Sequence, residues 1–380
     1  MPAAPVPQAA WRWRDAVGGF RDRLVTSKRF RRWAAAFPLT RPIARRRTRD
    51  LFDLTAGFVY SQVLLAGVRL RLFDLLAHGP LSESEIAARL DLPREGAARL
   101  IGACVALRLL ARRGGERVGL GPLGAALVDN PAITEMVLHH PMLYADLADP
   151  VALLRGARGG GTLADYWPYA VTDRPAALSG AQVAGYTGLM AASQPLVADQ
   201  ILDAYDLRKH RCLLDIGGGD GSFLCAAATR AKRLKLMLFD LPAVAARGEA
   251  RFAAAGLAGR AQAFGGDFAR DSLPGGADIA SLVRVIHDHD DDTARTILRA
   301  ARAALPPGGV LLLAEPMAGR SGAEPMGDAY FGLYLFAMGS GRARTPAVLT
   351  ELLREAGFAA VREVPTHTPL LTGLLVAEVR

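Results

Sequence analysis

The spacing of apolar residues divides this 380-residue chain into a mainly helical N-terminal part and a C-terminal part in which strands and helices alternate. Helical spacing predicts helices over residues 51–77, 83–90 and 93–107, and residues 129–208 are mainly helical by the same criterion, with a break at Gly159–Gly161. The predicted strands further on cover residues 213–216, 234–239, 261–264, 279–286, 310–314, 360–364 and 370–379, and the helices between them cover residues 221–230, 244–255, 291–304 and 346–357. Strands that alternate with helices of this length predict an α/β fold with a doubly wound parallel sheet.

Residues 51–128 form a separate helical module that ends in a hairpin. Ser82 followed by Glu85 is a capping box, which marks the start of the helix over 83–90. The helix over 93–107 is followed by short apolar runs on both sides of Gly114–Gly115, which predicts a hairpin. Two helices and a hairpin in this order are typical of a winged helix, so a ligand-responsive DNA-binding regulator is an alternative function. Its recognition helix offers only Arg94 and Arg99 to DNA, and we therefore expect no nucleic-acid partner.

The net positive charge of the chain is concentrated in an N-terminal arm. Residues 1–50 hold thirteen basic side chains against three aspartates, a net charge of +10, whereas the whole chain carries +9. Aromatic and apolar residues recur at helical steps between the arginines of this arm, as at Trp13, Phe20 and Trp33. Such a basic amphipathic helix can lie on an anionic membrane surface, or it can pack on a partner subunit with its arginines solvated, and both readings stay open.

The composition of the whole chain, 51% hydrophobic and 22% charged, is that of a globular protein. The longest apolar stretch, residues 59–77, is interrupted by Arg69, Arg71 and Asp74, so no transmembrane helix is expected. The N-terminus lacks the apolar core of a signal peptide, and the three cysteines show no metal or disulfide spacing. We expect a cytoplasmic protein, peripheral to the inner or photosynthetic membrane if the arm binds lipid.

A glycine-rich turn at residues 215–221 follows the first predicted strand of the sheet, where ligands of such folds bind. Asp240, after the next strand, is placed to accept the two hydroxyls of a ribose. The turn does not fit the nicotinamide fingerprint G-x-G-x-x-G, because its third small position falls on Ser222. A sulfonium amino acid favours nearby carboxylates, here Asp215 and Asp220, so the turn favours S-adenosylmethionine.

His287 follows a parallel strand on the same side of the sheet and is the candidate general base. An imidazole with a pKa near neutrality is suited to take the proton that a hydroxyl loses on methylation. The run at residues 287–292, His-Asp-His-Asp-Asp-Asp, is also similar to the metal-binding motif of metallo-hydrolases. The only later histidine is His367, so the further ligands of such a site are missing and no metal is expected.

Four ordered motifs give the C-terminal half a resemblance to the plant-type and bacterial small-molecule O-methyltransferases. They are the glycine turn at 215–221, Phe-Asp-Leu-Pro at 239–242, Gly-Asp-Phe at 266–268 and His-Asp-His-Asp at 287–290. His289 stands where this family usually has Trp. The resemblance implies a Rossmann-like domain that binds S-adenosylmethionine, and an N-terminal winged-helix domain through which the enzyme forms a homodimer.

Segments at 51–65, 139–150 and 338–342 further resemble the carotenoid O-methyltransferases of purple phototrophic bacteria. These enzymes methylate 1-hydroxycarotenoids such as demethylspheroidene, so the resemblance implies O-methylation of the tertiary 1-hydroxyl of an acyclic hydroxycarotenoid in carotenoid biosynthesis. The alternative within enzymes is O- or C-methylation of another apolar acceptor, such as a polyketide, a quinone, a phenol or a bacteriochlorophyll precursor.

The expected site residues follow from this resemblance and from the strand ends. The cofactor-binding candidates are Asp215, Gly217, Gly219, Asp240, Leu241, Asp267, Phe268 and Arg284. The catalytic candidates are His287, Asp288 and Glu315, the last as the acid that orients the imidazole. The substrate-pocket candidates are Tyr144, Trp167, Met190, Phe336 and Met338. The expected segments are the basic arm at 1–50, the winged-helix dimerisation domain at 51–128, a helical segment at 129–208 that contributes to the pocket, and the cofactor-binding catalytic domain at 209–380.

Overall fold

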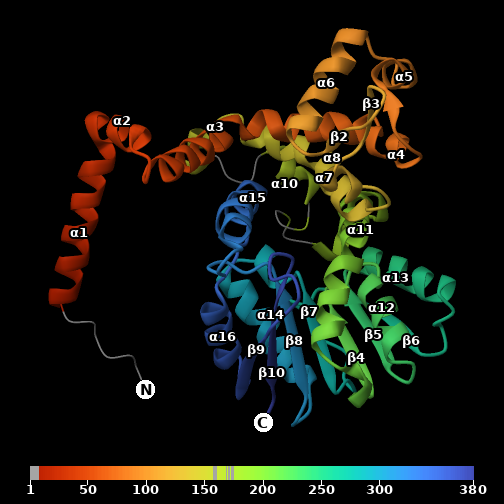
Figure 1. Ribbon diagram of the computed structural model, residues 1–380. Helices are drawn as coiled ribbons and strands as arrows, with labels where there is room; N and C mark the ends of the chain where they lie inside the picture. Colours follow the sequence, from red (N-terminus) through yellow and green to blue (C-terminus); the bar gives the residue numbers. More distant parts are fainter. Residues whose placement is uncertain (1–7, 157–160, 168, 170–171, 173–174) are drawn as a thin grey trace. The chain divides into compact units, whose positions relative to one another are not determined.

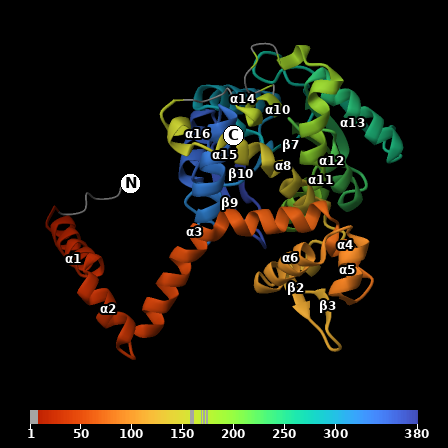
Figure 2. The same cartoon turned by 90° about the horizontal axis from the view of Figure 1, so that it is seen from above.

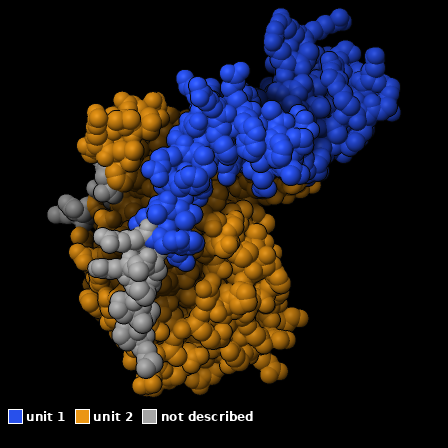
Figure 3. Space-filling view, turned by 60° about the vertical axis from the view of Figure 1, so that its left-hand side comes forward, with its two compact units in different colours: residues 1–125 blue, residues 126–380 orange. Residues whose placement is uncertain are grey.

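The computed structural model describes residues 8–156, 161–167, 169, 172 and 175–380, with the side chains of residues 8–12 excepted. The chain divides into two compact units, residues 1–125 and 126–380 (Figure 3). Of the predicted break at Gly159–Gly161, the first two glycines lie outside the described residues.

The first unit is helical with one small sheet. Its elements are α1 (Gln8–Thr26), α2 (Lys28–Ala36), α3 (Arg41–Arg69), α4 (Leu72–Ala77), β1 (Leu81–Ser82), α5 (Glu83–Arg89), α6 (Arg94–Ala106), β2 (Leu110–Arg112), β3 (Arg117–Leu120) and α7 (Pro122–Ala125). The predicted capping box is confirmed, since Ser82 and Glu85 each accept from the backbone amide of the other. The predicted hairpin is also confirmed, with β2 antiparallel to β3. The helix predicted over 51–77 begins earlier, at Arg41, and is interrupted at Arg71, whose φ is +53°.

Within the described part of the chain, α3 is long and apolar enough to cross a membrane by length and composition, whereas the sequence predicted no such helix. The difference arises because the helix starts at Arg41. The apolar residues before residue 59 therefore belong to the same helix, whereas the predicted apolar stretch began only at residue 59. Only 17% of its most apolar window is buried within the structure. Core helices of globular proteins meet the same criterion, so α3 is equally suited to be covered by protein.

The second unit is a seven-stranded sheet with helices on both faces. Before the sheet come α8 (Pro131–Asp146), α9 (Pro150–Leu154), α10 (Thr162–Tyr166), η2 (Pro175–Ala177), α11 (Gly180–Ala204) and η3 (Leu207–Lys209). The sheet region consists of β4 (Cys212–Ile216), α12 (Ser222–Arg230), β5 (Lys235–Asp240), α13 (Pro242–Ala254), β6 (Ala261–Gly265), β7 (Ile279–Val283), η4 (Ile286–Asp288), α14 (Asp291–Ala304), β8 (Val310–Glu315), η5 (Pro325–Tyr330, a π-helix), α15 (Phe331–Met338), α16 (Pro346–Glu355), β9 (Ala360–Val364) and β10 (Gly373–Glu378).

The strand order is β6-β5-β4-β7-β8-β10-β9. The five strands from β6 to β8 are parallel, as predicted, but β10 runs antiparallel to both of its neighbours. The sheet is therefore mixed. The reversal follows from the connection of β9 to β10, which contains no helix, because antiparallel strands can be joined by a short loop and parallel ones cannot.

Every residue of β4, β7 and β8 is buried, which explains why these strands read as continuous apolar runs. Alternate side chains point to opposite faces, so Leu213 packs with Ile201 and Phe223 of α11 and α12, whereas Leu214 packs with Ile297 of α14. Figures 1 and 2 show α11, α12 and α13 on one face of the sheet and α14 and α16 on the other. This double covering fixes the carboxyl ends of β4, β5, β6 and β7 at one edge, where the predicted site residues lie.

Candidate active site

The glycine-rich turn between β4 and α12 places backbone without side chains at the edge of the sheet. Gly217, Gly219 and Gly221 have φ values of +68°, +62° and +79°, which L-residues rarely adopt. A Cβ on Gly218 would collide with the carboxylate of Asp215. Glycines are therefore required here both by conformation and by space.

Two buried acids support this turn. Asp240 accepts from the backbone amides of Gly219 and Leu241, at 2.8 and 2.7 Å. Asp215 lies beneath the turn, where Ser281 donates to Oδ1 at 2.6 Å and Oδ2 has no partner among the described residues. Burial raises the pKa of each carboxyl to about 7. Both acids can therefore change charge near neutral pH, and Asp240 lines the cavity next to the turn, where it can accept hydrogen bonds from a ligand.

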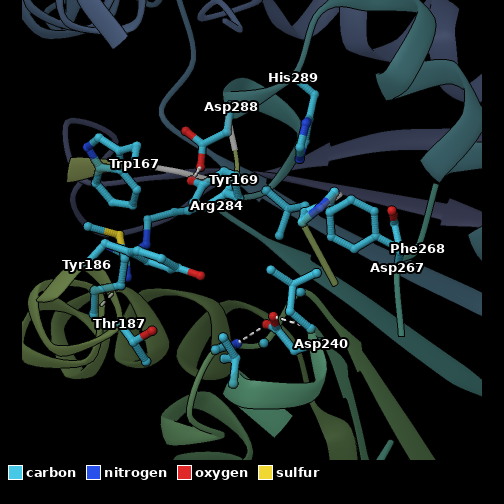
Figure 4. Close-up of a pocket in the computed structure, with 18 of the residues that line it drawn as sticks. Trp167, Tyr169, Tyr186, Thr187, Asp240, Asp267, Phe268, Arg284, Asp288 and His289 are labelled. Carbon is cyan, nitrogen blue, oxygen red and sulfur yellow. Dashed lines mark hydrogen bonds between the residues drawn. The ribbon is translucent and has the colours of Figure 1, made fainter. Parts of the chain in front are cut away.

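A cavity of about 390 Å³ opens above the turn. The expected site residues that line it are Gly217, Gly219, Asp240, Leu241, Asp267, Phe268, Arg284, Asp288, Trp167 and Met190. Figure 4 shows Asp240 and Asp267 with Phe268 on one part of the wall, and Trp167, Tyr186 and Thr187 on another. The cavity thus has an acidic part at the strand ends and an aromatic part next to α11.

Arg284 follows β7 and has a φ of +58°. Its guanidinium donates to Ser193 Oγ at 2.6 Å, to Met190 O at 3.1 Å and to Gln194 Oε1, all on α11. Nε has no partner among the described residues. Burial lowers the pKa of Arg284 to about 10, which leaves the group positively charged at neutral pH. Arg284 lines the cavity, and a buried cation there fits an anionic group of a ligand, such as the carboxylate of S-adenosylmethionine.

His287 lies between two carboxylates. Its Nδ1 is 2.5 Å from Glu315 Oε2, and its Nε2 is 3.1 Å from Asp288 Oδ1. Glu315 also accepts from the backbone amides of Val285 and Ile286, at 3.1 and 2.7 Å. Burial opposes a charge on the imidazole, but the two carboxylates outweigh it and raise the pKa of His287. Glu315 therefore orients the ring from the side away from Asp288.

Asp288 faces the cavity and joins the histidine to the aromatic wall. The hydroxyl of Tyr169 donates to Asp288 Oδ2 at 2.7 Å (Figure 4). His289 also lines the cavity, with its ring centroid 5.4 Å from that of Phe268 and 6.5 Å from that of Tyr169. Among the described residues, no three His, Cys, Asp or Glu side chains are grouped so as to hold a metal ion.

The remaining expected site residues are not part of the cavity wall. Among the described residues, its lining does not include Asp215, His287, Glu315, Tyr144, Phe336 or Met338. Phe336 and Met338 pack with the aromatic cluster that contains Trp167 and Tyr186. Tyr144 lies against His140, at 5.9 Å between ring centroids. The structure thus brings the cofactor-binding candidates other than Asp215 together around one cavity. It leaves His287, Glu315 and three of the five substrate-pocket candidates outside the lining.

Several lining residues did not figure among the expected site residues. One face of α11 contributes Tyr186, Thr187, Ala191 and Gln194 together with Met190. Their spacing of three or four residues follows the helical period, so once Met190 was chosen the same face could have been followed along the helix. His289 and Ser340 carry no such signal, because each lies in a loop whose path depends on tertiary packing.

Comparisons with known proteins agree with this geometry. A model of the O-methyltransferase domain matches residues 144–359, and a model of the O-methyltransferase dimerisation domain matches residues 52–130. The demethylspheroidene O-methyltransferase of Cereibacter sphaeroides is 43% identical over 355 residues, 93% of each chain. The enzyme of the same name from Rhodobacter capsulatus is 40% identical over 94% of this chain and 89% of its own. The structure of human N-acetylserotonin methyltransferase in complex with S-adenosylmethionine superimposes with a TM-score of 0.73 at 25% identity, covering 88% of this chain and 97% of that one.

Proposed function

The chain belongs to the O-methyltransferase family, and on that premise we propose that it methylates the tertiary 1-hydroxyl of an acyclic hydroxycarotenoid. It is an S-adenosylmethionine-dependent O-methyltransferase. The observation that carries the choice of substrate is the 43% identity, over 93% of both chains, to an enzyme named for demethylspheroidene. The carotenoid biosynthetic pathway is then the setting of the reaction.

The residues around the glycine turn would hold the cofactor. Asp240 would accept the ribose hydroxyls, the backbone of Gly217 and Gly219 allows close approach, and Asp267 with Phe268 closes the far side of the cavity. Arg284, a buried cation in the cavity wall, would pair with the amino-acid carboxylate. When bound, S-adenosylmethionine supplies an electrophilic methyl group on a positively charged sulfur.

His287, Asp288 and Glu315 form the acid–base group of the proposal. Glu315 fixes the ring at Nδ1, so Nε2 is the nitrogen that receives the acceptor's proton. In the structure that nitrogen faces Asp288, which must move aside or pass the proton on when an acceptor hydroxyl enters the cavity. A tertiary alcohol is a weak acid, so His287 takes the proton only as the bond between oxygen and methyl forms.

The size of the cavity limits how much of the acceptor can enter. Its volume of about 390 Å³ is near the lower end of the range for small-ligand pockets, roughly 300–1,000 Å³. Because the cofactor takes much of this space, only the hydroxyl-bearing end of a long polyene fits beside it. The rest of the acceptor must be accommodated outside the cavity that the described residues enclose.

We further propose that the arm holds the enzyme at the cytoplasmic face of an anionic membrane, where a carotenoid is dissolved. Trp13, Phe20 and Trp33 are 70%, 59% and 51% exposed, and arginines alternate with them along α1 and α2. Aromatic rings at headgroup depth combined with basic side chains are the pattern of an interfacial helix. Such a position would give the enzyme access to an acceptor that is dissolved in the membrane and insoluble in water.

The proposed reaction is tested by incubating the protein with methyl-labelled S-adenosylmethionine and, separately, with 1-hydroxycarotenoids in vesicles and with phenols. We expect the label in a methyl ether of the hydroxycarotenoid. Label in the phenols and in no carotenoid would overturn the substrate, although the protein would still be a methyltransferase. Calorimetry without acceptor tests the cofactor site separately. If the site is as proposed, S-adenosylmethionine binds whichever acceptor the enzyme uses.

A further inference from the structure

The loop that carries His287 is fixed by a second segment, residues 340–344, which we call the strap. It connects α15 to α16 and lies against η4. All four carbonyls of residues 286–289 accept hydrogen bonds from it. The pairs are Arg344 Nη1 to Ile286 O at 2.7 Å, Arg342 N to His287 O at 2.8 Å, Ser340 Oγ to Asp288 O at 2.7 Å and Arg344 Nη2 to His289 O at 2.7 Å.

Arg344 is the centre of the strap. It is 3% exposed, which is unusual for an arginine. Its guanidinium spans the catalytic pair, because it binds the carbonyl immediately before His287 and the carbonyl immediately after Asp288. Asp291, at the start of α14, neutralises its charge through contacts with Nε at 3.0 Å and Nη2 at 2.8 Å. The planar, fixed geometry of a guanidinium suits this bridging and a lysine ammonium does not.

The contact between strap and loop leaves no room for adjustment. Gly341 has a φ of +79°, and a Cβ at this position would collide with the carbonyl oxygen of His287. On its other side the loop is held by Glu315, which accepts from two of its backbone amides. Strap and Glu315 together bind both the donors and the acceptors of the loop backbone.

We propose that Arg344 is a positioning residue that fixes His287 and Asp288 relative to the bound acceptor, acting through the carbonyls of Ile286 and His289. The proposal rests on the proposed function, since it assigns the strap to the acid–base group of methyl transfer. It accounts for a buried charge that neither touches the cavity nor contributes to its lining among the described residues.

The test compares Arg344→Lys and Arg344→Gln with Arg295→Gln. Arg295 is a matched control because it also pairs with an acid of α14, Asp292 at 3.2 Å, but donates to no carbonyl of the loop among the contacts described. Because small displacements of a catalytic group are costly, we expect kcat to fall on the order of 100-fold in both Arg344 variants. The Kd for S-adenosylmethionine and the KM for the acceptor should stay within about twofold, and the control should keep wild-type kcat.

A second readout does not depend on turnover. In the folded protein, nuclear magnetic resonance titration of the His287 ring, assigned with His287→Ala, should show its pKa moving back toward that of an ordinary histidine when Arg344 is replaced. The reason is that the ring is no longer held between its two carboxylates. If the wild-type protein methylates no acceptor, this titration still decides the positioning role, so the two proposals fail separately.

Wild-type kcat together with an unchanged His287 titration in a folded Arg344 variant would overturn the proposal. Equal losses of cofactor affinity and kcat would also overturn it, because they indicate a general structural role. If neither Arg344 variant folds, Ser340→Ala, at a residue that also lines the cavity, removes one hydrogen bond of the strap, the one to Asp288 O. We then expect a fall in kcat of several-fold with unchanged cofactor affinity, and no change in kcat would contradict the positioning role.

Discussion

The two carboxylates at His287 have opposite consequences for catalysis. They hold the ring in place, but they also favour its protonated form, which cannot accept a proton. The imidazole must therefore be neutral when the acceptor binds, and the balance between positioning and basicity sets the pH at which the enzyme works.

Replacement of His287 by Ala should greatly reduce turnover while leaving cofactor binding intact, because His287 does not line the cavity among the described residues. We expect a loss of kcat on the order of 10² to 10⁴. Steady-state kinetics and calorimetry with S-adenosylmethionine measure the two quantities. Near-normal turnover in this variant would show that His287 is not the base.

The pH dependence of kcat follows from the raised pKa of His287. Below this pKa the ring is an imidazolium and inactive, so kcat should rise with pH through an inflection above 6.5, the ordinary value for histidine. Glu315→Gln removes one of the charges that raise the pKa, and the inflection should move to lower pH. An inflection unaffected by this substitution would mean that another group titrates.

Cofactor affinity should also depend on pH, through Asp240. Its pKa is raised to about 7, so a ligand whose hydroxyls donate to the carboxylate binds the ionised form and releases a proton. Affinity should increase as the pH rises through about 7, and calorimetry in buffers of different ionisation enthalpy should detect the proton. Asp240→Asn should lower the affinity by about 10- to 100-fold. Asp215 has a similar pKa, so Asp215→Asn is the control. In this variant the affinity for S-adenosylmethionine should still increase as the pH rises through about 7.

At the scale of elements, the turn between β4 and α12 allows the sharpest test of packing. Gly218→Ala would drive a methyl group into the carboxylate of Asp215 and to within 2.7 Å of Leu238. We expect destabilisation of about 1–3 kcal/mol, seen in the melting temperature, and weaker binding of S-adenosylmethionine. Gly188→Ala on α11 is the matched control, because a Cβ there meets nothing within 4 Å. Similar behaviour of the two variants would contradict the close packing of the turn.

The element boundaries show what the sequence could predict. Buried strands such as β4 and β8 were predicted to within one residue because apolar side chains fill both faces of the sheet. The strand predicted over 279–286 ends at Val283, although Val285 and Ile286 are apolar and buried. There Arg284 adopts a positive φ and Glu315 takes the next two amides, so a side chain distant in sequence ends the strand. Hydrophobic periodicity contains no information of that kind.

The same limit applies to the candidate site. Gly217, Asp240 and Asp267 follow strand ends, and the rule that ligands bind at the carboxyl edge of a parallel sheet predicts where they meet. Phe336 and Met338 were assigned to the pocket, but α15 packs them into the aromatic cluster outside the cavity lining. Which face of a helix lines a cavity depends on how the helix packs, and a single sequence does not determine this.

At the scale of the whole molecule, two exposed apolar surfaces call for different partners. The face of α3 that presents Leu51, Leu54 and Phe58 lies at the start of the family's dimerisation domain, which supports a homodimer. The arm, residues 1–50, lies outside both family matches and carries a net charge of +10, against +9 for the whole chain. A homodimer would therefore cover the exposed apolar side chains of α3, and the proposed membrane contact would cover those of the arm.

Combined replacement of Trp13, Phe20 and Trp33 by Ser should release the protein from vesicles that contain anionic lipid, because these rings would supply the buried apolar area. Co-sedimentation with anionic and with neutral vesicles measures this, and binding of the wild type should weaken as salt is added. Leu154→Ser, at a residue 60% exposed outside the arm, is the control. Dissociation of the dimer in the triple variant, without a change in vesicle binding, would instead favour an arm that packs on the partner subunit.

The most direct test of the account is a competition. Equal amounts of an acyclic 1-hydroxycarotenoid in vesicles and a phenolic acceptor are offered to the protein with methyl-labelled S-adenosylmethionine, and His287→Ala serves as the reference. We expect the label to enter the carotenoid as a methyl ether, and we expect His287→Ala to transfer at least about 100-fold less of it. Label in the phenol alone, or in neither acceptor, would contradict it.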